Sequence, residues 1–149
     1  MLVLKYLNRI REITDALNEK TKFTYDANGN LLTVTDAKNQ TITYTYNARD
    51  KVVTMKDQLG KVETYSYDKM DNLVSVKDRK IQTTSYAYNI LNQLTKTIYA
   101  DGSYIAYTHD AVGRITYIND SLSGPIGYTY SNDSCAACGG AVDKVIQEL

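Results

Sequence analysis

Apolar and polar side chains alternate in short runs along most of the chain, as residues 40–46 illustrate. Ile42, Tyr44 and Tyr46 occupy every second position there, with threonines between them. Successive side chains of a strand point to opposite faces, so these three share one face of a predicted strand. A tight turn is expected over 47–50, a second strand over 51–57, and then a looser turn. Repeated along the chain, this pattern predicts an all-β fold, an antiparallel β-meander.

The pattern of two strands recurs every 21 residues, and each copy carries a pair of ring positions. A fixed period of this length is typical of repeat proteins, in which one unit cannot bury its apolar face alone. We expect the two ring positions to form structural columns along the sheet. They are filled by Phe23 and Tyr25, Tyr44 and Tyr46, Tyr65 and Tyr67, Tyr86 and Tyr88, Tyr107 and His109, and Tyr128 and Tyr130.

An aliphatic position on each return strand is expected to fall between successive rings of a column. It is filled by Ile10, Leu31, Val52, Leu73, Leu94 and Ile115. Ten of the fourteen tyrosines lie in the columns, which favours a structural role for them over a dedicated aromatic binding surface. Four tyrosines outside the columns are freer for a surface role: Tyr6, Tyr99, Tyr104 and Tyr117.

The tight turns share a composition that explains their conformation. The first residue is Asp or Asn, whose side chain accepts a hydrogen bond from a backbone N–H two residues on, and the fourth tolerates a positive φ. The predicted turn residues at these two positions are Asp26 and Gly29, Asn47 and Asp50, Asp68 and Asp71, Asn89 and Asn92, and Asp110 and Gly113.

Residues 1–130 are interpreted as six to seven repeats, of which the first is degenerate. Counting back 21 positions from the first ring pair gives Leu2 and Leu4. Read alone, residues 2–17 are also compatible with an amphipathic helix. Lys5 and Arg9 interrupt the apolar run that a secretion signal would need.

Residues 131–149 are interpreted as an enlarged, cysteine-containing turn followed by the first strand of a further, truncated repeat. Val145 is the expected first apolar residue after that turn, which implies an insertion of nine residues. The insertion carries Cys135 and Cys138, which are expected to form a local disulfide or to remain two free thiols in the enlarged turn. Metal or disulfide linkage to another molecule is the alternative, because zinc within this chain would lack a second ligand pair. The haem-attachment motif would need His at Gly139, and a redox pair would need a βαβ context.

Composition limits the functional classes. Seventeen basic and seventeen acidic residues give zero formal net charge, so nothing draws the chain electrostatically to nucleic acid or to an anionic membrane. No apolar stretch approaches the roughly 20 residues of a membrane helix. We expect no cofactor.

Two apparent sites do not match the chemistry they suggest. Asp26, Asn28 and Asn30 have the spacing that opens a calcium loop, but the glycine and glutamate required further on are missing. His109 and Asp110, with a serine nearby, are the residue types of a catalytic triad. The histidine lies in a ring column and the aspartate in a turn, however, so we predict no catalytic residue and no enzyme.

The pattern aromatic-x-Tyr-Asp-x-x-Gly-(Asn/Arg)-Leu, carried by residues 23–31, resembles the YD repeat of the Rhs/YD-repeat family. Members include bacterial Rhs polymorphic toxins, shell components of insecticidal toxin complexes, wall-associated proteins and animal teneurins. The resemblance recurs in register over nearly the whole chain. It implies antiparallel sheets that spiral into a hollow shell, which in the toxins encloses a cytotoxic domain. Four positions depart from the pattern: Asp50, Asp71 and Asn92 replace the glycine, and His109 replaces the second tyrosine.

Toxin members of the family carry a self-cleavage motif with an Asp-Pro pair before the toxin. The single proline here, Pro125, follows Gly124 instead. The resemblance therefore implies neither a self-cleavage centre nor a toxin domain in this sequence.

The sequence thus predicts a structural protein that acts by enclosure or scaffolding. We expect a segment of a secreted or cell-surface shell, or a self-assembling fibre, with the rest of a longer chain or identical subunits as partners. Ordinary repeat strands at both ends favour that expectation. The alternative is an extracellular carbohydrate-binding or adhesion module with glycans as partners.

Overall fold

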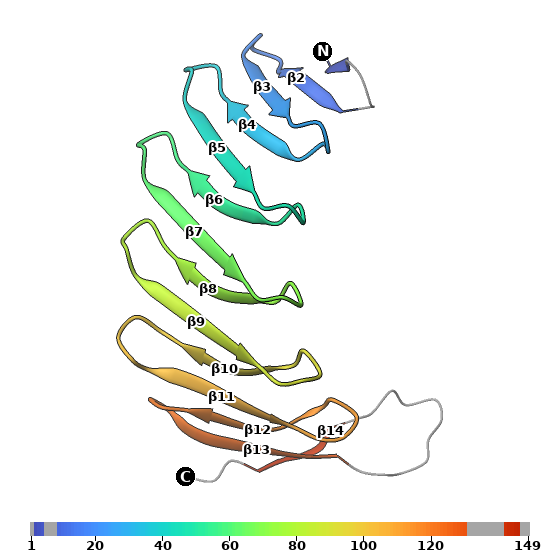
Figure 1. Cartoon of the computed structure of the whole chain (residues 1–149), viewed down its shortest axis with the longest axis vertical. Coiled ribbons are helices and arrows are strands. Elements are labelled where there is room, and N and C mark those ends of the chain that lie inside the picture. Colours follow the sequence, from blue (N-terminus) through green and yellow to red (C-terminus); the bar gives the residue numbers. More distant parts are fainter. Residues whose placement is uncertain (1, 5–8, 131–141, 147–149) are drawn as a thin grey trace. The chain divides into compact units, whose positions relative to one another are not determined.

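A computed structural model describes residues 2–4, 9–130 and 142–146, and the side chains of residues 9–130. All secondary structure in these residues is β-strand, and none of them is helical (Figure 1). The predicted all-β class is confirmed. The strands are β1 (Leu2–Leu4), β2 (Ile10–Thr14), β3 (Lys20–Tyr25), β4 (Leu31–Thr35), β5 (Thr41–Tyr46), β6 (Val52–Lys56), β7 (Val62–Tyr67), β8 (Leu73–Lys77), β9 (Thr83–Tyr88), β10 (Leu94–Ile98), β11 (Tyr104–His109), β12 (Ile115–Asp120), β13 (Gly124–Tyr130) and β14 (Val142–Ile146).

Each strand pairs with the next one along the chain, in the order β1 to β14. Every strand pair with a described register is antiparallel. The predicted antiparallel meander is therefore confirmed. The chain divides into two compact units, Met1–Ser66 with Val76–Ile81 and Tyr67–Ser75 with Gln82–Leu149, and each is described by itself.

A β-bulge occurs at the same place in each strand pair whose first strand carries the two ring positions and whose register is described. In the first unit Thr24 faces Thr33 and Tyr25 faces Leu31, so Leu32 is an extra residue on β4. The pair β5–β6 has the same shift, as do β9–β10, β11–β12 and β13–β14 in the second unit. The return pairs have a regular register. Because a bulge increases local twist, each repeat bends its sheet once, just before the tight turn.

The two ends of the chain follow this register too. Leu4 faces Ile10 across the same bulge, so β1 and β2 pair as later repeats do. At the other end Tyr130 faces Val142, whereas Val145 faces Tyr128. The predicted alignment of Val145 was wrong. Twelve positions separate Tyr130 from Val142, against six between Tyr25 and Leu31, so the insertion is six residues rather than nine.

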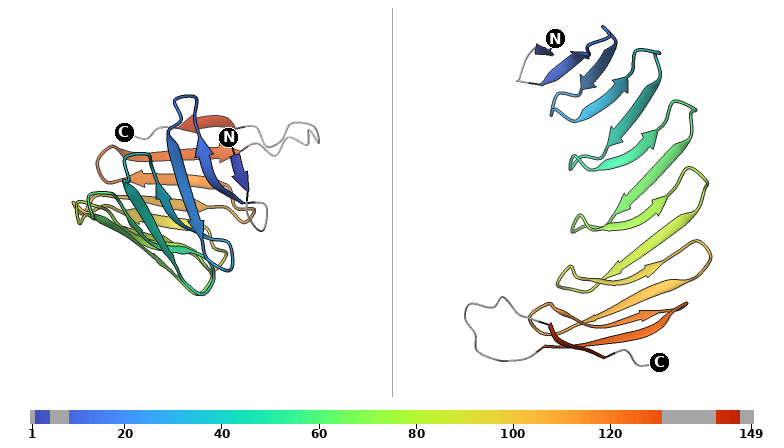
Figure 2. Two further views of the ribbon diagram at one scale, coloured as in Figure 1. Left: turned by 90° about the horizontal axis from the view of Figure 1, so that it is seen from above. Right: turned by 180° about the vertical axis from the view of Figure 1, so that it is seen from behind.

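The described strands of each unit form one layer, as the views from above and behind show (Figure 2). One face carries the ring columns, and in the first unit the other face is rich in threonine. Hydroxyl pairs join neighbouring strands there at 2.6 Å (Thr24 and Thr33, Thr45 and Thr54) and 2.9 Å (Thr35 and Thr41). Among the residues with described side chains no hydrophobic one is buried, and Asp57 and Thr97 are the two buried polar residues. Each unit is thus a sheet without a core of its own.

Candidate functional site

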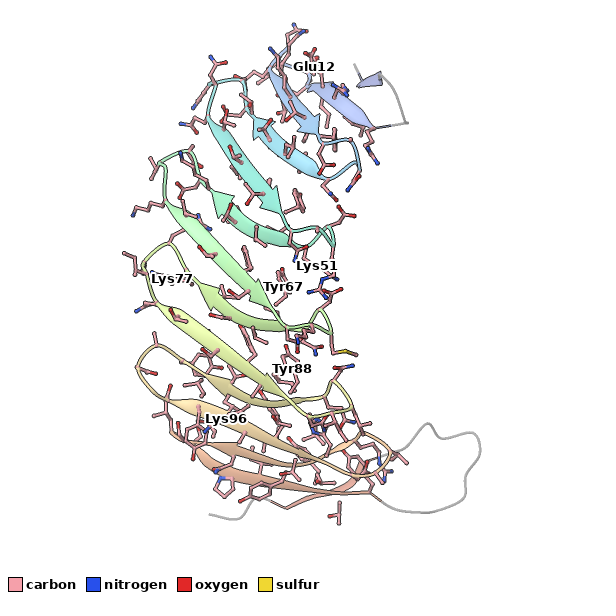
Figure 3. The ribbon with its side chains drawn as sticks, in the orientation of Figure 1. Glu12, Lys51, Tyr67, Lys77, Tyr88 and Lys96 are labelled. Atoms are coloured by element: carbon pink, nitrogen blue, oxygen red, sulfur yellow. The ribbon has the colours of Figure 1, made fainter. Side chains whose placement is uncertain are left out.

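Four of the tyrosines at the second ring position link their repeat to the one before it. Each of these four hydroxyls donates to the backbone carbonyl of the aliphatic residue fifteen positions earlier. The ring therefore crosses that aliphatic residue, and its polar end satisfies a main-chain oxygen. The pairs are Tyr25 with Ile10 at 2.9 Å, Tyr46 with Leu31 at 2.8 Å, Tyr88 with Leu73 at 3.0 Å and Tyr130 with Ile115 at 2.7 Å. We call this series the tyrosine ladder; Figure 3 labels Tyr88.

Sequence periodicity did not predict these hydrogen bonds, although the sequence carries a signal for them. The second ring position holds tyrosine, or histidine at 109, whereas the single phenylalanine, Phe23, lies at the first. A ring with a polar end is needed only where it must reach a carbonyl. Burial raises the pKa of the Tyr88 and Tyr46 hydroxyls above the ordinary 10.0, and the neighbouring tyrosines Tyr86 and Tyr44 and the carboxylates of Asp68 and Asp26 add to the shift.

The rings of the first column pack against the return strand instead. Phe23 faces Val34 and Tyr44 faces Met55 in the first unit. In the second unit Tyr86 faces Thr97 and Tyr107 faces Ile118. Such cross-strand pairs of a ring with an aliphatic or β-branched side chain stabilise a sheet by about 0.2–1 kcal/mol each. Tyr65 also donates to Glu63 Oε1 at 2.7 Å.

The tight turns have one geometry, set by their first and fourth residues. In the turn after β3, Asp26 Oδ1 accepts hydrogen bonds from the N–H groups of Gly29 and Asn30 at 2.7 and 2.8 Å. Gly29 N–H also bonds the Asp26 carbonyl at 3.2 Å, and its φ is 93°. The other predicted fourth residues have a positive φ too: 58° at Asp50, 67° at Asp71, 59° at Asn92 and 89° at Gly113.

Return turns that open with aspartate, expected to be looser, are built the same way. Asp36 Oδ1 accepts from the N–H groups of Lys38 and Gln40 at 2.9 and 2.8 Å, and Asn39 has a φ of 60°. The turn after β6 repeats this with Asp57 and Gly60. The expectation of a looser turn was wrong for these turns, because an Asp side chain at the first position accepts the same backbone hydrogen bonds as in the tight turns. Ile81 occupies the fourth position after β8 with a φ of 69°, an unfavourable conformation for a β-branched residue.

Side-chain amides connect successive tight turns along one edge of the sheet. In the first unit Asn28 and Asn30 donate to Asp50 Oδ1 at 3.0 and 2.6 Å. In the second unit Asn72 donates to Asn92 Oδ1 at 2.9 Å. These contacts join repeats 21 residues apart at the turns, as the tyrosine ladder joins them across the strands.

Basic residues add contacts at the ring columns. The guanidinium of Arg114 lies 4.2 Å from the centre of the Tyr130 ring, and that of Arg9 lies 5.7 Å from Tyr25. Arg9 Nη2 also donates to the Asn28 carbonyl at 3.3 Å. At this distance the ring face attracts the cation, so each arginine covers the ring that follows it in the ladder.

Hydrogen bonds to the turn carboxylates lower their pKa values. Burial acts to raise the pKa of Asp26, but the Asn30 side chain and the N–H groups of Asn30 and Gly29 outweigh it. The same balance lowers the pKa of Asp110, where the bonds come from Arg114, and that of Asp57. Asp57 is 8% exposed, and Arg79 lies 3.5 Å from both Asp57 Oδ2 and Glu63 Oε2.

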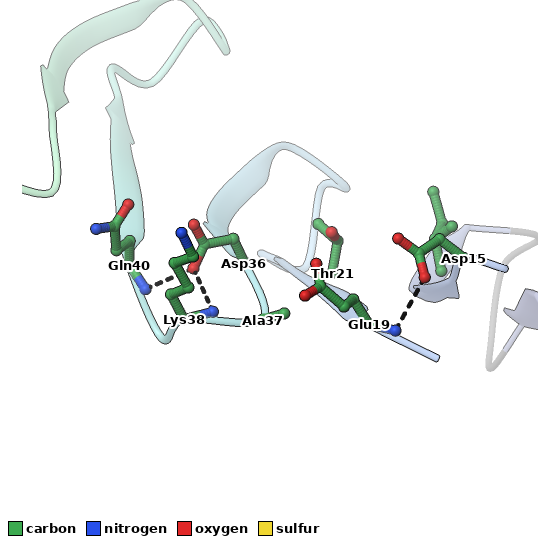
Figure 4. A pocket seen from close by; sticks show the side chains of 8 residues that line it. Asp15, Glu19, Thr21, Asp36, Ala37, Lys38 and Gln40 are labelled. Carbon is green, nitrogen blue, oxygen red and sulfur yellow. Dashed lines mark hydrogen bonds between the residues drawn. The ribbon is translucent and has the colours of Figure 1, made fainter. Parts of the chain in front are cut away.

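Two hollows flank the first return turns, and neither has the donor set of a metal site. One, of about 220 Å³, is lined by Asp15, Glu19 and Asp36 among others (Figure 4). The Asp15 and Asp36 carboxylates already accept backbone hydrogen bonds in their turns. The other, of about 550 Å³, lies over Lys20, Lys22 and threonines. Within residues 9–130, no three His, Cys, Asp or Glu side chains are placed to hold a metal ion.

The remaining candidate residues are placed as follows. Asn30 donates to Asp26 Oδ2 at 3.0 Å, so these two members of the calcium-like triplet bond each other. His109 stands at a ladder position, Asp110 accepts from Arg114 Nε at 2.7 Å, and Ser103 donates to Asp101 at 2.6 Å. This arrangement separates the triad-like residues into different hydrogen-bond pairs. Cys135 and Cys138 lie outside the described residues. In the part of the chain that is described, no helix has the length and apolarity to cross a membrane.

A repeated strand pair with a ring ladder and Asp-held turns defines a class, the YD-repeat proteins. The family model described as Teneurin YD-shell matches residues 5–134. The chain therefore belongs to the YD-shell family, and the resemblance to Rhs/YD-repeat proteins is confirmed. No curated protein matches the sequence.

Solved structures with a similar fold include TcdB2-TccC3 complexes and a Tc holotoxin pore. A crystal structure of TcdB2-TccC3-Cdc42 is 19% identical with a TM-score of 0.63, over 76% of this chain and 6% of that one. A crystal structure of TcdB2-TccC3 is 21% identical with a TM-score of 0.61, over 75% and 6%. A Photorhabdus luminescens Tc holotoxin pore is 20% identical with a TM-score of 0.62, over 75% and 6%. The chain thus spans about 6% of the length of these structures, and the likeness concerns the fold.

Proposed function

We propose that this chain is a stretch of shell wall, whose function is to enclose or scaffold rather than to catalyse. Two observations together support the proposal. The sheet is one layer thick and has no buried hydrophobic side chain in residues 9–130. Tyrosine hydroxyls also join neighbouring repeats by hydrogen bonds. A sheet must cover its apolar face against something. In a wall that covering comes from further repeats, and the wall separates an interior from solvent.

Family membership supports this role, because YD-shell repeats are the family's defining element. Both kinds of link described above are local to neighbouring repeats. A wall of this kind can therefore be extended by adding repeats without any change in the contacts of the existing ones. The partners in this proposal are other YD repeats, and the setting is an extracellular or cell-surface assembly.

Electron microscopy of the native assembly tests the proposal. The assembly would be captured from its source with an antibody raised against residues 9–130. We expect a hollow particle whose wall is one sheet thick, about 10 Å. A solid particle would overturn the enclosure role, and a fibre would replace the shell with a filament. Release of an enclosed polypeptide only after the wall is disrupted would identify what is held.

A further inference from the structure

The tight turn after β3 contains Asn28 followed by Gly29, the single Asn-Gly pair of the sequence. Such a pair is chemically reactive, because the backbone nitrogen of the second residue can attack the side-chain carbonyl carbon of the first. Glycine has no Cβ that would shield its nitrogen. Asn28 is exposed, so water reaches it. The turn therefore combines a reactive pair with access to solvent.

Two charged groups flank the peptide bond between Asn28 and Gly29. On its nitrogen side, the Gly29 N–H donates to the Asp26 carboxylate at 2.7 Å. On its oxygen side, Arg9 Nη2 donates to the Asn28 carbonyl at 3.3 Å. The Arg9 guanidinium covers this peptide so closely that a Cβ on Gly29 would overlap it. A base thus faces the proton that must leave, and a cation faces the oxygen on which negative charge develops.

We propose that Asn28 is a site of spontaneous modification, which loses its amide through a cyclic succinimide formed with Gly29. Asp26 takes the proton from the Gly29 nitrogen, and this nitrogen attacks Asn28 Cγ. The new bond from nitrogen to Cγ closes the ring, the bond from Cγ to Nδ2 breaks, and the amide nitrogen leaves as ammonia with the proton that Asp26 held. Water then opens the ring at either carbonyl and leaves aspartate or isoaspartate at position 28. The reaction needs no other reactant.

The hydrogen bond from Asn28 to Asp50 delays this reaction. Asn28 Nδ2 donates to Asp50 Oδ1 at 3.0 Å, which holds the side chain toward the next tight turn. The side chain must turn back toward Gly29 before the attack, so this bond has to open first. It is a single bond in an exposed place, where water competes for both of its groups. The fold therefore slows the first step but does not prevent it.

The modification removes a link between two repeats. In the unmodified chain Asn28 and Asn30 both donate to Asp50 Oδ1, at 3.0 and 2.6 Å. After the reaction, position 28 carries a carboxylate in place of a donor, and it faces the carboxylate of Asp50. Two negative charges this close repel each other. The contact between the turns after β3 and β5 is thus weakened as the protein ages.

Peptide mapping of the full chain during storage tests the proposal. The folded chain is kept in mildly alkaline buffer, sampled over time, digested with trypsin and analysed by mass spectrometry, and the first sample corrects for conversion during digestion. Trypsin releases residues 23–38, which contain Asn28 and also Asn30, the matched control before the bulky Leu31. We expect Asn28 to convert faster than every other asparagine, with isoaspartate detected by a protein isoaspartyl methyltransferase. Conversion of Asn28 no faster than that of Asn30 would overturn the proposal.

The variant Asp26→Asn tests whether the folded turn promotes the reaction. Asn47 opens the turn after β5 with the same kind of backbone hydrogen bonds, so the fold accepts asparagine at this position. We expect Asn28 to convert roughly tenfold more slowly in the folded variant, because asparagine does not take up the proton. In urea, where residue 26 is no longer held at the Gly29 nitrogen, the variant and the parent chain should react at the same rate. A folded variant that reacts as fast as the parent, or a difference that persists in urea, would refute the role of Asp26 and with it the proposal.

The variant Asn28→Asp copies one product of the reaction and measures its effect on the fold. It should lower the urea midpoint, and the loss should be clearly smaller in an Asp50→Asn background, where the facing group is uncharged. Asn92 accepts the equivalent bond from Asn72, so asparagine fits this turn position. Equal losses in the two backgrounds would contradict the weakened contact between the turns. None of these results bears on the wall function, which the microscopy decides separately.

Discussion

The tyrosine ladder leads to a direct prediction, that the hydroxyl of Tyr88 stabilises the fold while that of Tyr86 does not. Both tyrosines lie in β9, two positions apart. Tyr88 donates to the Leu73 carbonyl at 3.0 Å, whereas within the described residues the Tyr86 hydroxyl has no hydrogen-bond partner. Tyr88→Phe and Tyr86→Phe remove the same atom from the same strand, so their difference isolates the hydrogen bond.

The size of the effect follows from what the carbonyl loses. A hydrogen bond within a protein contributes about 0.5–1.5 kcal/mol net, and an acceptor left without a partner adds to the loss when water cannot reach it. Leu73 is half-buried, so water replaces the hydroxyl in part. We expect Tyr88→Phe to lower the free energy of unfolding by about 1 kcal/mol and Tyr86→Phe to change it by less than about 0.3 kcal/mol.

His109 provides the reverse experiment. It stands at a ladder position, fifteen residues after Leu94. His109→Tyr should add the missing ladder bond and raise the free energy of unfolding by about 0.5–1 kcal/mol, whereas His109→Phe should not. Urea denaturation followed by circular dichroism measures all four variants, and the midpoint should move without a change in slope. Equal losses in Tyr88→Phe and Tyr86→Phe would show that the hydroxyl bond is not what links the repeats.

Three further predictions concern the turns. Ile81→Asn should raise the free energy of unfolding by about 1 kcal/mol, or the melting temperature by roughly 2–4 °C. The reason is that asparagine tolerates the φ of 69° at this position, which is already 73% exposed. The control is Ile90→Asn, at an exposed turn position without a positive φ, and equal shifts in the two variants would refute backbone strain at Ile81. Gly29→Ala should lower the free energy of unfolding by about 2 kcal/mol and Gly102→Ala by about 1 kcal/mol. Both glycines have a positive φ, but a Cβ at Gly29 would overlap the Arg9 guanidinium, whereas a Cβ at Gly102 meets open space. Thermal unfolding compares the two variants, and a smaller loss for Gly29→Ala than for Gly102→Ala would contradict this prediction. The pKa values of Asp26, Asp57 and Asp110 are lowered in the folded state. Their contribution to the free energy of unfolding is therefore complete above the ordinary pKa of 3.8 and is lost as the pH falls through the lower folded-state values. Unfolding measured over an acid pH series should show this loss, and Asp26→Asn, which copies the asparagine of the turn after β5, should make the loss smaller. An acid transition that does not change in Asp26→Asn would count against a role for the turn carboxylates.

These predictions treat the chain as a row of repeats that depend on their neighbours. Ring hydroxyls hold four of the repeats to the one before, and side-chain amide hydrogen bonds join two pairs of neighbouring turns. Damage at one position should therefore weaken two repeats rather than the whole sheet. Hydrogen exchange of the Tyr88→Phe variant should therefore increase most in β8 and β9.

Much of the secondary structure of this protein could be predicted from its sequence, because it depends on local interactions. The 21-residue period, the alternation of faces and the Asp or Asn at the start of each turn depend on residues within one repeat. Those features predicted the strands, the meander, the turn positions with a positive φ and the family. The first repeat could be located in the same way, because Leu2 and Leu4 keep the period although they do not keep the rings.

Contacts between strands decided the rest, because register is set by pairing and not by spacing along the chain. Three contacts join residues that no local pattern relates. They are the bulge that makes Tyr25 face Leu31, the hydrogen bond from the Tyr46 hydroxyl to the Leu31 carbonyl, and the side-chain hydrogen bond from Asn72 to Asn92. The register at Val142 corrected the C-terminal alignment for the same reason. Sequence periodicity determined what each repeat is made of, and only the tertiary structure determined how one repeat holds the next.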